Sequence, residues 1–184
     1  MQMGPHMKMT SVWPQAPGDI QRAQAIVQVA QQCFAKYKDY HLALQDGYQI
    51  FAPNVPQDIY HFASVANFSE AQTTFDLAHP SALLYNKVGD GYQFVGVMYS
   101  AAPDATQDQL NALIPLSVAP WHEHTNICLP AGDNTQVLFD SNSLFGLTGT
   151  ITTQAQCSKL GGTFLPQLFG WMVHIPLFGS VGIG

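Results

Sequence analysis

The chain has 184 residues, of which 47% are hydrophobic and 10% are charged, and its net charge at pH 7 is -6. Typical domains carry about 25% charged residues, so this chain is unusually poor in charge. Nucleic-acid binding requires a cluster of lysines and arginines, and the six present here form no cluster. No run of 18 apolar residues exists, so we predict no transmembrane segment.

One domain is expected over residues 10–184, because this length suits a single core and no linker divides it. The first residues contain Gly4-Pro5-His6-Met7, a pattern typical of what remains after a fusion tag is cleaved. We therefore expect residues 1–9 to be an expression remnant and exclude His6 from the site. The low charge and the polar, uncharged composition favour a periplasmic or secreted protein whose signal peptide would have been removed.

A long helix is predicted at the beginning of this domain, from Asp19 to the Asp46-Gly47 pair. Gly47 suits the left-handed conformation that ends helices, and we expect the helix to cover one face of a sheet. Residues spaced three and four apart would form its buried face: Ile20, Ala23, Val27, Ala30, Phe34, Tyr37, His41 and Leu44.

Short strands are predicted for the rest of the chain. The clearest element is a hairpin, in which residues 81–87 and 92–99 flank a Gly-Asp-Gly turn. Other strands are expected at 48–51, 58–62, 121–129, 163–169 and 171–177, and short helices at 107–113, with a Thr106/Gln109 capping box, and at 153–160. We therefore predict a mainly β, α+β fold: a small antiparallel β-barrel or sandwich with the long helix packed on it.

The segment His122-Glu123-His124 is the strongest candidate for a functional site. Side chains alternate along a strand, so His122 and His124 would share one face and Glu123 would point to the other. Two neighbouring imidazoles can hold a divalent metal ion. The alternative is that His122 is a hydrogen-bonded core residue and His124 is exposed.

Further metal ligands are expected from two other predicted strands. His174 would supply the third nitrogen of an open three-histidine site, and His61 is the candidate fourth ligand. Met172 shares the face of His174, and its thioether would favour copper. Copper or zinc is the expected metal, with iron or manganese as alternatives.

A cavity beside the metal is also expected. Its walls would include Tyr85 and Tyr99 from the hairpin, Trp121, Met172, and Asn126, which continues the face of the histidine pair. Core packing is the commoner role for such aromatic residues. The chain contains no GxSxG, HExxH or P-loop motif, so no other catalytic centre is predicted.

Three cysteines are present, Cys33, Cys128 and Cys157, and none belongs to a CxxC pair. In an exported protein one disulfide is expected, with Cys128 and Cys157 as the preferred pair. Three buried thiols in a cytoplasmic protein are the alternative.

On its histidine motifs the chain resembles the cupin superfamily. The first cupin motif has an HxH in a strand, which His122-Glu123-His124 matches. The second motif runs through a glycine and a proline to a final histidine, an order followed at different spacings by Gly162, Pro166, Gly170 and His174. The resemblance implies a metal-binding β-barrel.

The sequence departs from the cupin pattern after the HxH. The acidic ligand that the family has there is missing, because Ile127-Cys128-Leu129 occupies the region, and His61 would have to replace it. Most of the chain also resembles uncharacterised exported bacterial proteins, through the hairpin, Trp121-His122 and the late Trp171-x-x-His174. That resemblance implies no activity.

Three functions follow from these observations. The first is a histidine-lined metal site with an open coordination position, which would allow oxidative chemistry with copper or iron, or hydrolysis with zinc. The second is a non-catalytic periplasmic metal carrier or sensor, favoured if four ligands close the site. The third is a metal-free barrel that binds a small molecule. The sequence leaves open whether the protein is an enzyme.

Overall fold

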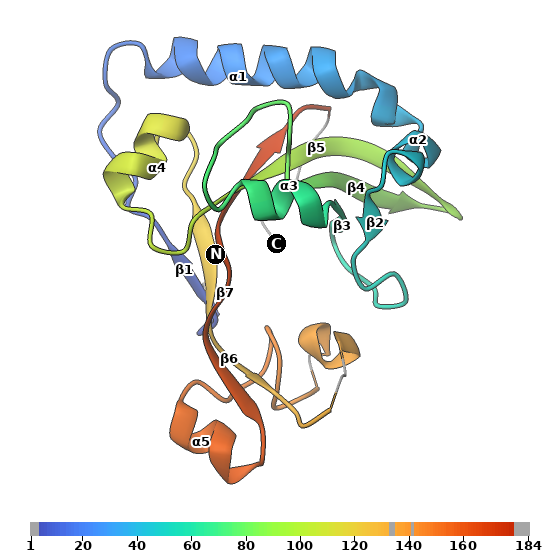
Figure 1. Ribbon diagram of the computed structural model, residues 1–184, viewed down its shortest axis with the longest axis vertical. Coiled ribbons are helices and arrows are strands. Elements are labelled where there is room, and N and C mark those ends of the chain that lie inside the picture. The colour runs from blue at the N-terminus through green and yellow to red at the C-terminus, as the bar shows by residue number, and fades with distance from the viewer. Residues whose placement is uncertain (1–3, 133–134, 141, 179–184) are drawn as a thin grey trace.

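The computed structural model describes residues 4–132, 135–140 and 142–178. Its centre is one seven-stranded antiparallel sheet (Figure 1). Across the sheet the strands follow the order β1-β6-β7-β5-β4-β3-β2. Their bounds are β1 (Met7–Met9), β2 (Gln49–Ile50), β3 (Tyr60–Ala63), β4 (Ala82–Val88), β5 (Gly91–Ala101), β6 (His122–Leu129) and β7 (Thr163–Pro176).

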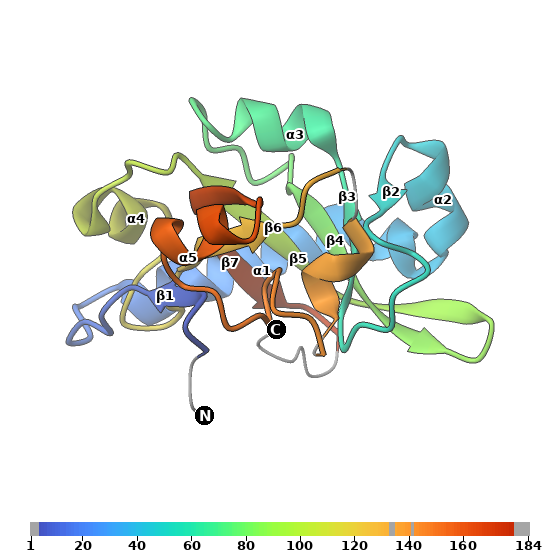
Figure 2. The ribbon, with the colours of Figure 1, turned by 90° about the horizontal axis from the view of Figure 1, so that it is seen from below.

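Helices cover the sheet from both sides. The α-helices are α1 (Asp19–Phe34), α2 (Tyr40–Gln45), α3 (Val65–Glu70), α4 (Gln107–Leu113) and α5 (Gln154–Lys159), and the 3-10 helices are η1 (Ala35–Lys38) and η2 (Thr135–Phe139). The longest, α1, lies across one face, whereas η2 and α5 lie on the opposite side (Figures 1 and 2). None of the helices in the described ranges is both long and apolar enough to cross a membrane.

The sequence correctly predicts the α+β class, the antiparallel sheet and a long helix in the N-terminal part of the chain. The described strands form one open sheet, however, so the expected β-barrel or sandwich is not confirmed. Closure requires the two edge strands to pair along their length. Here the edges are β1, with three residues, and β2, with two, so neither offers enough backbone for a stable pairing.

Strand alternation gives the sheet two different faces. The face toward α1 carries the main core, which includes Phe62, Tyr85, Val97, Tyr99 and Trp121 packed with residues of α1 and η1. The opposite face carries a smaller apolar cluster: Ile59, Ala82, Leu84, Val95, Met98 and Met172. Because this cluster is smaller than the main core, its face of the sheet has room for a functional site.

The helix predicted from Asp19 to Asp46 is interrupted, which corrects the sequence prediction. After α1 and η1 the backbone is extended at Asp39, whose side chain accepts a hydrogen bond from the His41 amide and so caps α2. Aspartate is a strong N-cap because its carboxylate satisfies a free amide of the first turn. The apolar period continues across the break, so periodicity alone conceals it. Gly47 has φ 92°, the left-handed conformation predicted for it.

The shorter predicted elements are confirmed. The hairpin is formed by β4 and β5. Thr106 and Gln109 make both hydrogen bonds of the capping box at α4, and Thr153 caps α5.

The two strands expected at 163–169 and 171–177 are one long strand, β7. His122 of β6 pairs with Met172 of β7, and His124 pairs with Leu168. The same interval therefore takes two residue steps in β6 and four in β7, so β7 carries two extra residues there. Phe169 and Gly170 form this bulge with φ of 68° and 69°. A bulge bends its strand; beyond it β7 pairs with β6 alone, and the two strands form an arm below the sheet (Figure 1).

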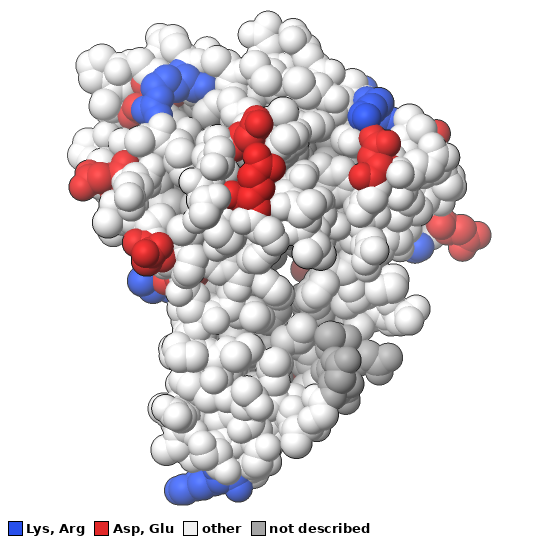
Figure 3. All heavy atoms as spheres, viewed as in Figure 1, with Lys and Arg blue, Asp and Glu red and all other residues white. Residues whose placement is uncertain are grey.

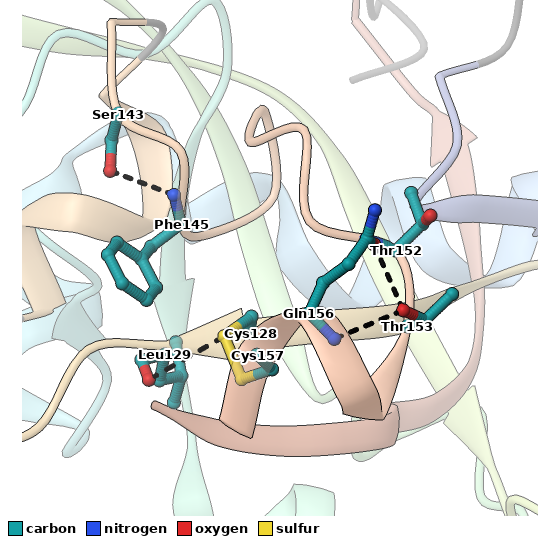
Figure 4. Close-up of a disulfide and its surroundings, with 8 residues drawn as sticks. All are labelled: Cys128, Leu129, Ser143, Phe145, Thr152, Thr153, Gln156 and Cys157. Atoms are coloured by element: carbon teal, nitrogen blue, oxygen red, sulfur yellow. Dashed lines mark hydrogen bonds between the residues drawn. A yellow bond between two sulfur atoms is a disulfide. The ribbon is translucent and has the colours of Figure 1, made fainter. Parts of the chain in front are cut away.

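A disulfide between Cys128 and Cys157 fastens this arm to α5 (Figure 4), as the sequence analysis preferred. Both cysteines are fully buried. A Cβ atom on Gly162 would lie 2.7 Å from the Sγ of Cys128 and 2.9 Å from that of Cys157, so only glycine fits beside the bridge.

Residues expected to be an expression remnant take part in the fold. In β1, Met7 and Met9 lie opposite His124 and His122 of β6, and His6 is only 2% exposed. Leaving this segment out of the structural prediction was therefore wrong, because its backbone completes one edge of the sheet.

Removal of the disulfide should destabilise the protein. Because the bridge closes a separation of 29 residues, the Cys128→Ser/Cys157→Ser double variant should lose about 3–4 kcal/mol of unfolding free energy through the larger conformational entropy of its unfolded chain. Urea unfolding measures this loss. Cys33→Ser is the matched control, since Cys33 is exposed and free; an equal loss in both variants would contradict the prediction.

Candidate functional site

Four histidines from three strands line one cavity of about 970 Å³ on the face opposite α1. His61 comes from β3, His122 and His124 from β6, and His174 from β7. These are the four residues that the sequence predicts as metal ligands. The structure brings all of them to one place.

Curvature of the sheet makes this convergence possible. Two strands, β4 and β5, separate β3 from β7, and three strand spacings in a flat sheet amount to about 14 Å. The Nε2 atoms of His61 and His174 nevertheless lie only 3.2 Å apart. The sheet curves toward this face and the two rings lean together across it. Leu84 pairs with Gly96 and Tyr85 pairs with Phe94, so Val95 of β5 is an extra residue between them. This bulge and the absence of a side chain at Gly96 allow the bend.

The rings form a connected group. Ring centroids are 5.2 Å apart for His61 and His174, 5.1 Å for His122 and His174, and 5.8 Å for His122 and His124. His174 is thus the central member of the group. His61, which the sequence analysis ranks as the fourth ligand, lies about as near to His174 as His122 does. His124 is the outermost member, since it is linked to the group through His122.

Burial keeps the four imidazoles uncharged at neutral pH. It lowers the pKa of His61 to about 4 and that of His122 to about 3. Burial also lowers the pKa of His124, and that of His174 well below the usual value. Repulsion between neighbouring imidazoles adds to the effect, since each would disfavour a charge on the next. The ring nitrogens therefore carry the free lone pairs that a metal ion requires.

One nitrogen of the central ring lacks a hydrogen-bond partner. The Nδ1 atom of His174 is buried and contacts no donor or acceptor in the described residues, while its Nε2 atom faces His61. Buried polar atoms are almost always paired. For His61, burial lowers the pKa and the Ile59 backbone acts in the opposite direction.

The opposite side of β6 behaves as alternation predicts. Glu123 is buried away from the histidine face, where it accepts hydrogen bonds from Gln167 and, at 2.7 Å, from Lys8 Nζ. Its charge is thus compensated by Lys8 and it does not reach the cavity.

Most of the predicted cavity-lining residues lie elsewhere, which corrects the sequence analysis. Tyr85, Tyr99 and Trp121 belong to the core under α1. The Tyr85 and Tyr99 hydroxyls donate to the carbonyls of Tyr37 and Leu77, both at 2.9 Å. Strand alternation turns them to the face opposite the histidines.

Met172 does line the cavity, as predicted, and Asn126 does not. Asn126 has φ 58°, a left-handed conformation that interrupts the alternation begun by His122 and His124. The two-residue period therefore fails after His124.

Two sets of lining residues are not predicted from the sequence. His6 was excluded with the supposed tag remnant, yet it lines the cavity and its Nε2 donates to the Gly149 carbonyl at 2.8 Å. Phenylalanines from four separate segments also line it: Phe51, Phe68, Phe139 and Phe169. Only their aromatic character is visible in the sequence, because their meeting depends on tertiary structure.

A second group of possible ligands lies on the surface. Glu70, Asp76 and His79 place their ligand atoms within 4.8 Å of one another, which no three of the cavity histidines do in the described arrangement. The His79 ring is already hydrogen-bonded to Glu70 at 2.9 Å. In the view of Figure 3 charged side chains are sparse and most of the surface is uncharged. Exposed acidic groups of this kind are common without a metal ion.

No protein-family model, curated protein or solved structure matches this chain.

The buried histidines should make the metal-free protein unstable in weak acid. In the unfolded chain their pKa is near 6.5, whereas in the folded protein it is about 4 for His61 and about 3 for His122. Between these values the unfolded state binds more protons, so the free energy of unfolding should fall as the pH drops from about 6.5 toward about 4. Urea unfolding with chelator present, between about pH 4 and pH 7, measures the slope.

His122→Asn should flatten this slope because it removes one of the groups that gain a proton on unfolding. His41→Asn is the matched control, since His41 is exposed on α2 and outside the cavity. A stability that stays constant down to about pH 4, or an identical slope in His122→Asn, would contradict the assignment.

Proposed function

We propose that the protein binds one divalent transition-metal ion through His61, His122 and His174, with His124 as a fourth ligand in reach. The observation that carries this proposal is the convergence of four uncharged imidazoles on one cavity. The cluster is largely buried and neutral, with no carboxylate among the four rings, and metal coordination would give its nitrogens partners.

The closest pair supports this reading. Two nitrogens bound to one tetrahedral zinc ion at about 2.0–2.1 Å lie about 3.4 Å apart, and the Nε2 atoms of His61 and His174 are 3.2 Å apart. The rings of His122 and His124 have centroids 5.8 Å apart. We propose that these two side chains would rotate to bring their nitrogens to the ion and complete the coordination. Strands hold the four Cα positions, and the cavity leaves the rings space to rotate.

The donor set favours copper or zinc. Imidazole suits zinc, copper, iron and nickel, whereas calcium and magnesium prefer oxygen ligands. Asp58 is the one carboxylate among the described lining residues and it is exposed. Met98 and Met172 line the same cavity, and a thioether within reach would favour copper over zinc. Iron and manganese, which commonly take a carboxylate, are the less favoured metals.

The surroundings favour a site with an open coordination position. The histidines face a cavity and not a closed core, so a small molecule can reach an ion held by three of them. Such an ion acts as a Lewis acid or a redox centre, and the protein would then be a metal-dependent enzyme. A carrier or sensor is the alternative if all four histidines close the coordination shell.

We also propose an extracytoplasmic location and retain the likeness to cupins as a hypothesis. The disulfide between Cys128 and Cys157 supports an oxidising compartment such as the periplasm. The HxH of β6 on a curved antiparallel sheet supports the cupin likeness, and the open sheet and missing acidic ligand stand against it.

A metal-free ligand-binding protein is the second candidate function. It is favoured by the size of the cavity, about 970 Å³, since ligand pockets of about 300–1,000 Å³ are typical of small-molecule sites. Metal binding discriminates between the two candidates.

Metal titration tests the proposal. Chelator-treated protein should bind about one equivalent of copper or zinc, and His174→Ala should weaken binding by at least about tenfold because it removes the central ligand. Calorimetric titration and elemental analysis of protein purified without nickel-affinity chromatography measure both quantities.

His79→Ala is the matched control, since it removes a histidine from the exposed Glu70, Asp76 and His79 group and leaves the cavity intact. Circular dichroism would verify that each variant is folded. Loss of binding in His79→Ala with retention in His174→Ala would place the metal on the surface, and the absence of binding in the wild-type protein would leave the metal-free ligand-binding function.

A further inference from the structure

Beyond the histidines, the cavity wall is largely apolar and aromatic. Phe51 packs edge-to-face against Phe139 and Phe169, with ring centroids 5.9 and 6.0 Å apart, and Phe68 packs edge-to-face against Phe169 at 6.3 Å. The four rings come from the segment after β2, from α3, from η2 and from the β7 bulge. All four are only partly buried, although they lie in contact with each other, so they border open space.

The β7 bulge aims Phe169 at this cavity. Phe169 has φ 68°, a left-handed conformation that is rare for a bulky residue. Gly170 follows with φ 69°, and a Cβ atom there would lie 2.7 Å from the Ala101 carbonyl oxygen. Backbone conformations of this kind persist where the surrounding structure requires them and cluster at functional sites. Here the bulge turns the Phe169 ring to the histidine face, where it packs with the cluster that contains Met98 and Met172.

The charges around the cavity limit what it can hold. None of its described lining residues is a lysine or an arginine, and the one carboxylate is the exposed Asp58. A phosphate or sulfate ester would leave several charged oxygens in an apolar environment without cationic partners, which is strongly unfavourable. Polyanionic and strongly cationic ligands are therefore poor candidates.

We propose that the site takes a small molecule with an apolar, ring-sized or larger body and a single polar head group able to coordinate a metal ion. The head would lie at His61, His122 and His174, and the body among the phenylalanines; the inference rests on the metal site proposed above. The cavity, about 970 Å³, is large enough for a ligand of many more atoms than the head group alone.

Paired probes test this inference. Imidazole and 4-phenylimidazole carry the same metal-binding head, and only the second has an aromatic body. They would be titrated calorimetrically into zinc-loaded protein whose metal content has been measured. Burial of the phenyl group should make 4-phenylimidazole bind on the order of tenfold more tightly than imidazole.

Phe169→Ala should reduce this preference several-fold and leave the metal content and the imidazole affinity unchanged. Phe178→Ala is the matched control, because Phe178 is also partly buried but packs with the core on the other face and should preserve the preference. A Phe169→Leu variant retains an apolar side chain if the alanine variant is unstable.

The outcomes separate the two proposals. Equal affinities for imidazole and 4-phenylimidazole at full metal occupancy would overturn the inferred ligand class and leave the metal site standing. Failure to load metal would overturn the proposed function, and with it the placement of the head group, before either probe is added. A preference that Phe169→Ala and Phe178→Ala reduce equally would place the aromatic body outside the cavity and also overturn the inference.

Discussion

Curvature of the sheet is the constraint on which the site depends. His61 and His174 lie on strands separated by two others, and only a sheet bent toward their face brings their nitrogens to 3.2 Å. Two local features allow the bend, the extra residue Val95 in β5 and the absence of a side chain at Gly96 opposite Leu84. The core under α1 supports it from the convex side, because large residues such as Tyr85 and Tyr99 fill that face while Ala82 and Gly96 occupy the concave one.

A second device completes the cavity. The two extra residues of β7 redirect the strand away from β5, so that β6 and β7 continue as an arm. The arm carries the disulfide, which joins Cys128 of β6 to Cys157 of α5. The segment between β6 and α5 supplies Phe139, Leu147 and Thr148 to the cavity. The disulfide thus anchors the segment between β6 and α5, whose side chains form one wall of the cavity. The histidines form the opposite wall.

Local rules predicted the histidines of the candidate site better than the architecture around them. Alternation along a strand correctly placed His122 and His124 on one face, and cysteine number and context gave the bridge. The same alternation predicts that Trp121, directly before His122, faces the core, as it does in the structure. The break at Asp39 was missed because capping competes with periodicity. His6 was excluded because its Gly-Pro-His-Met context resembles a tag, whereas its burial depends on pairing with a strand more than a hundred residues away. The open sheet was not predictable, because closure depends on which strands meet at the edges.

Burial has two opposed consequences for the four histidines. It lowers their pKa values, to about 4 for His61 and about 3 for His122, so acid favours unfolding. The same shift removes proton competition for the nitrogens, which an exposed cluster with a pKa near 6.5 would face at mildly acidic pH. An exposed cluster of histidines would be protonated in the pH range where these four stay uncharged. The predicted instability in acid and the proposed metal binding therefore have the same cause, since a variant that exposed the rings would reduce the first and weaken the second.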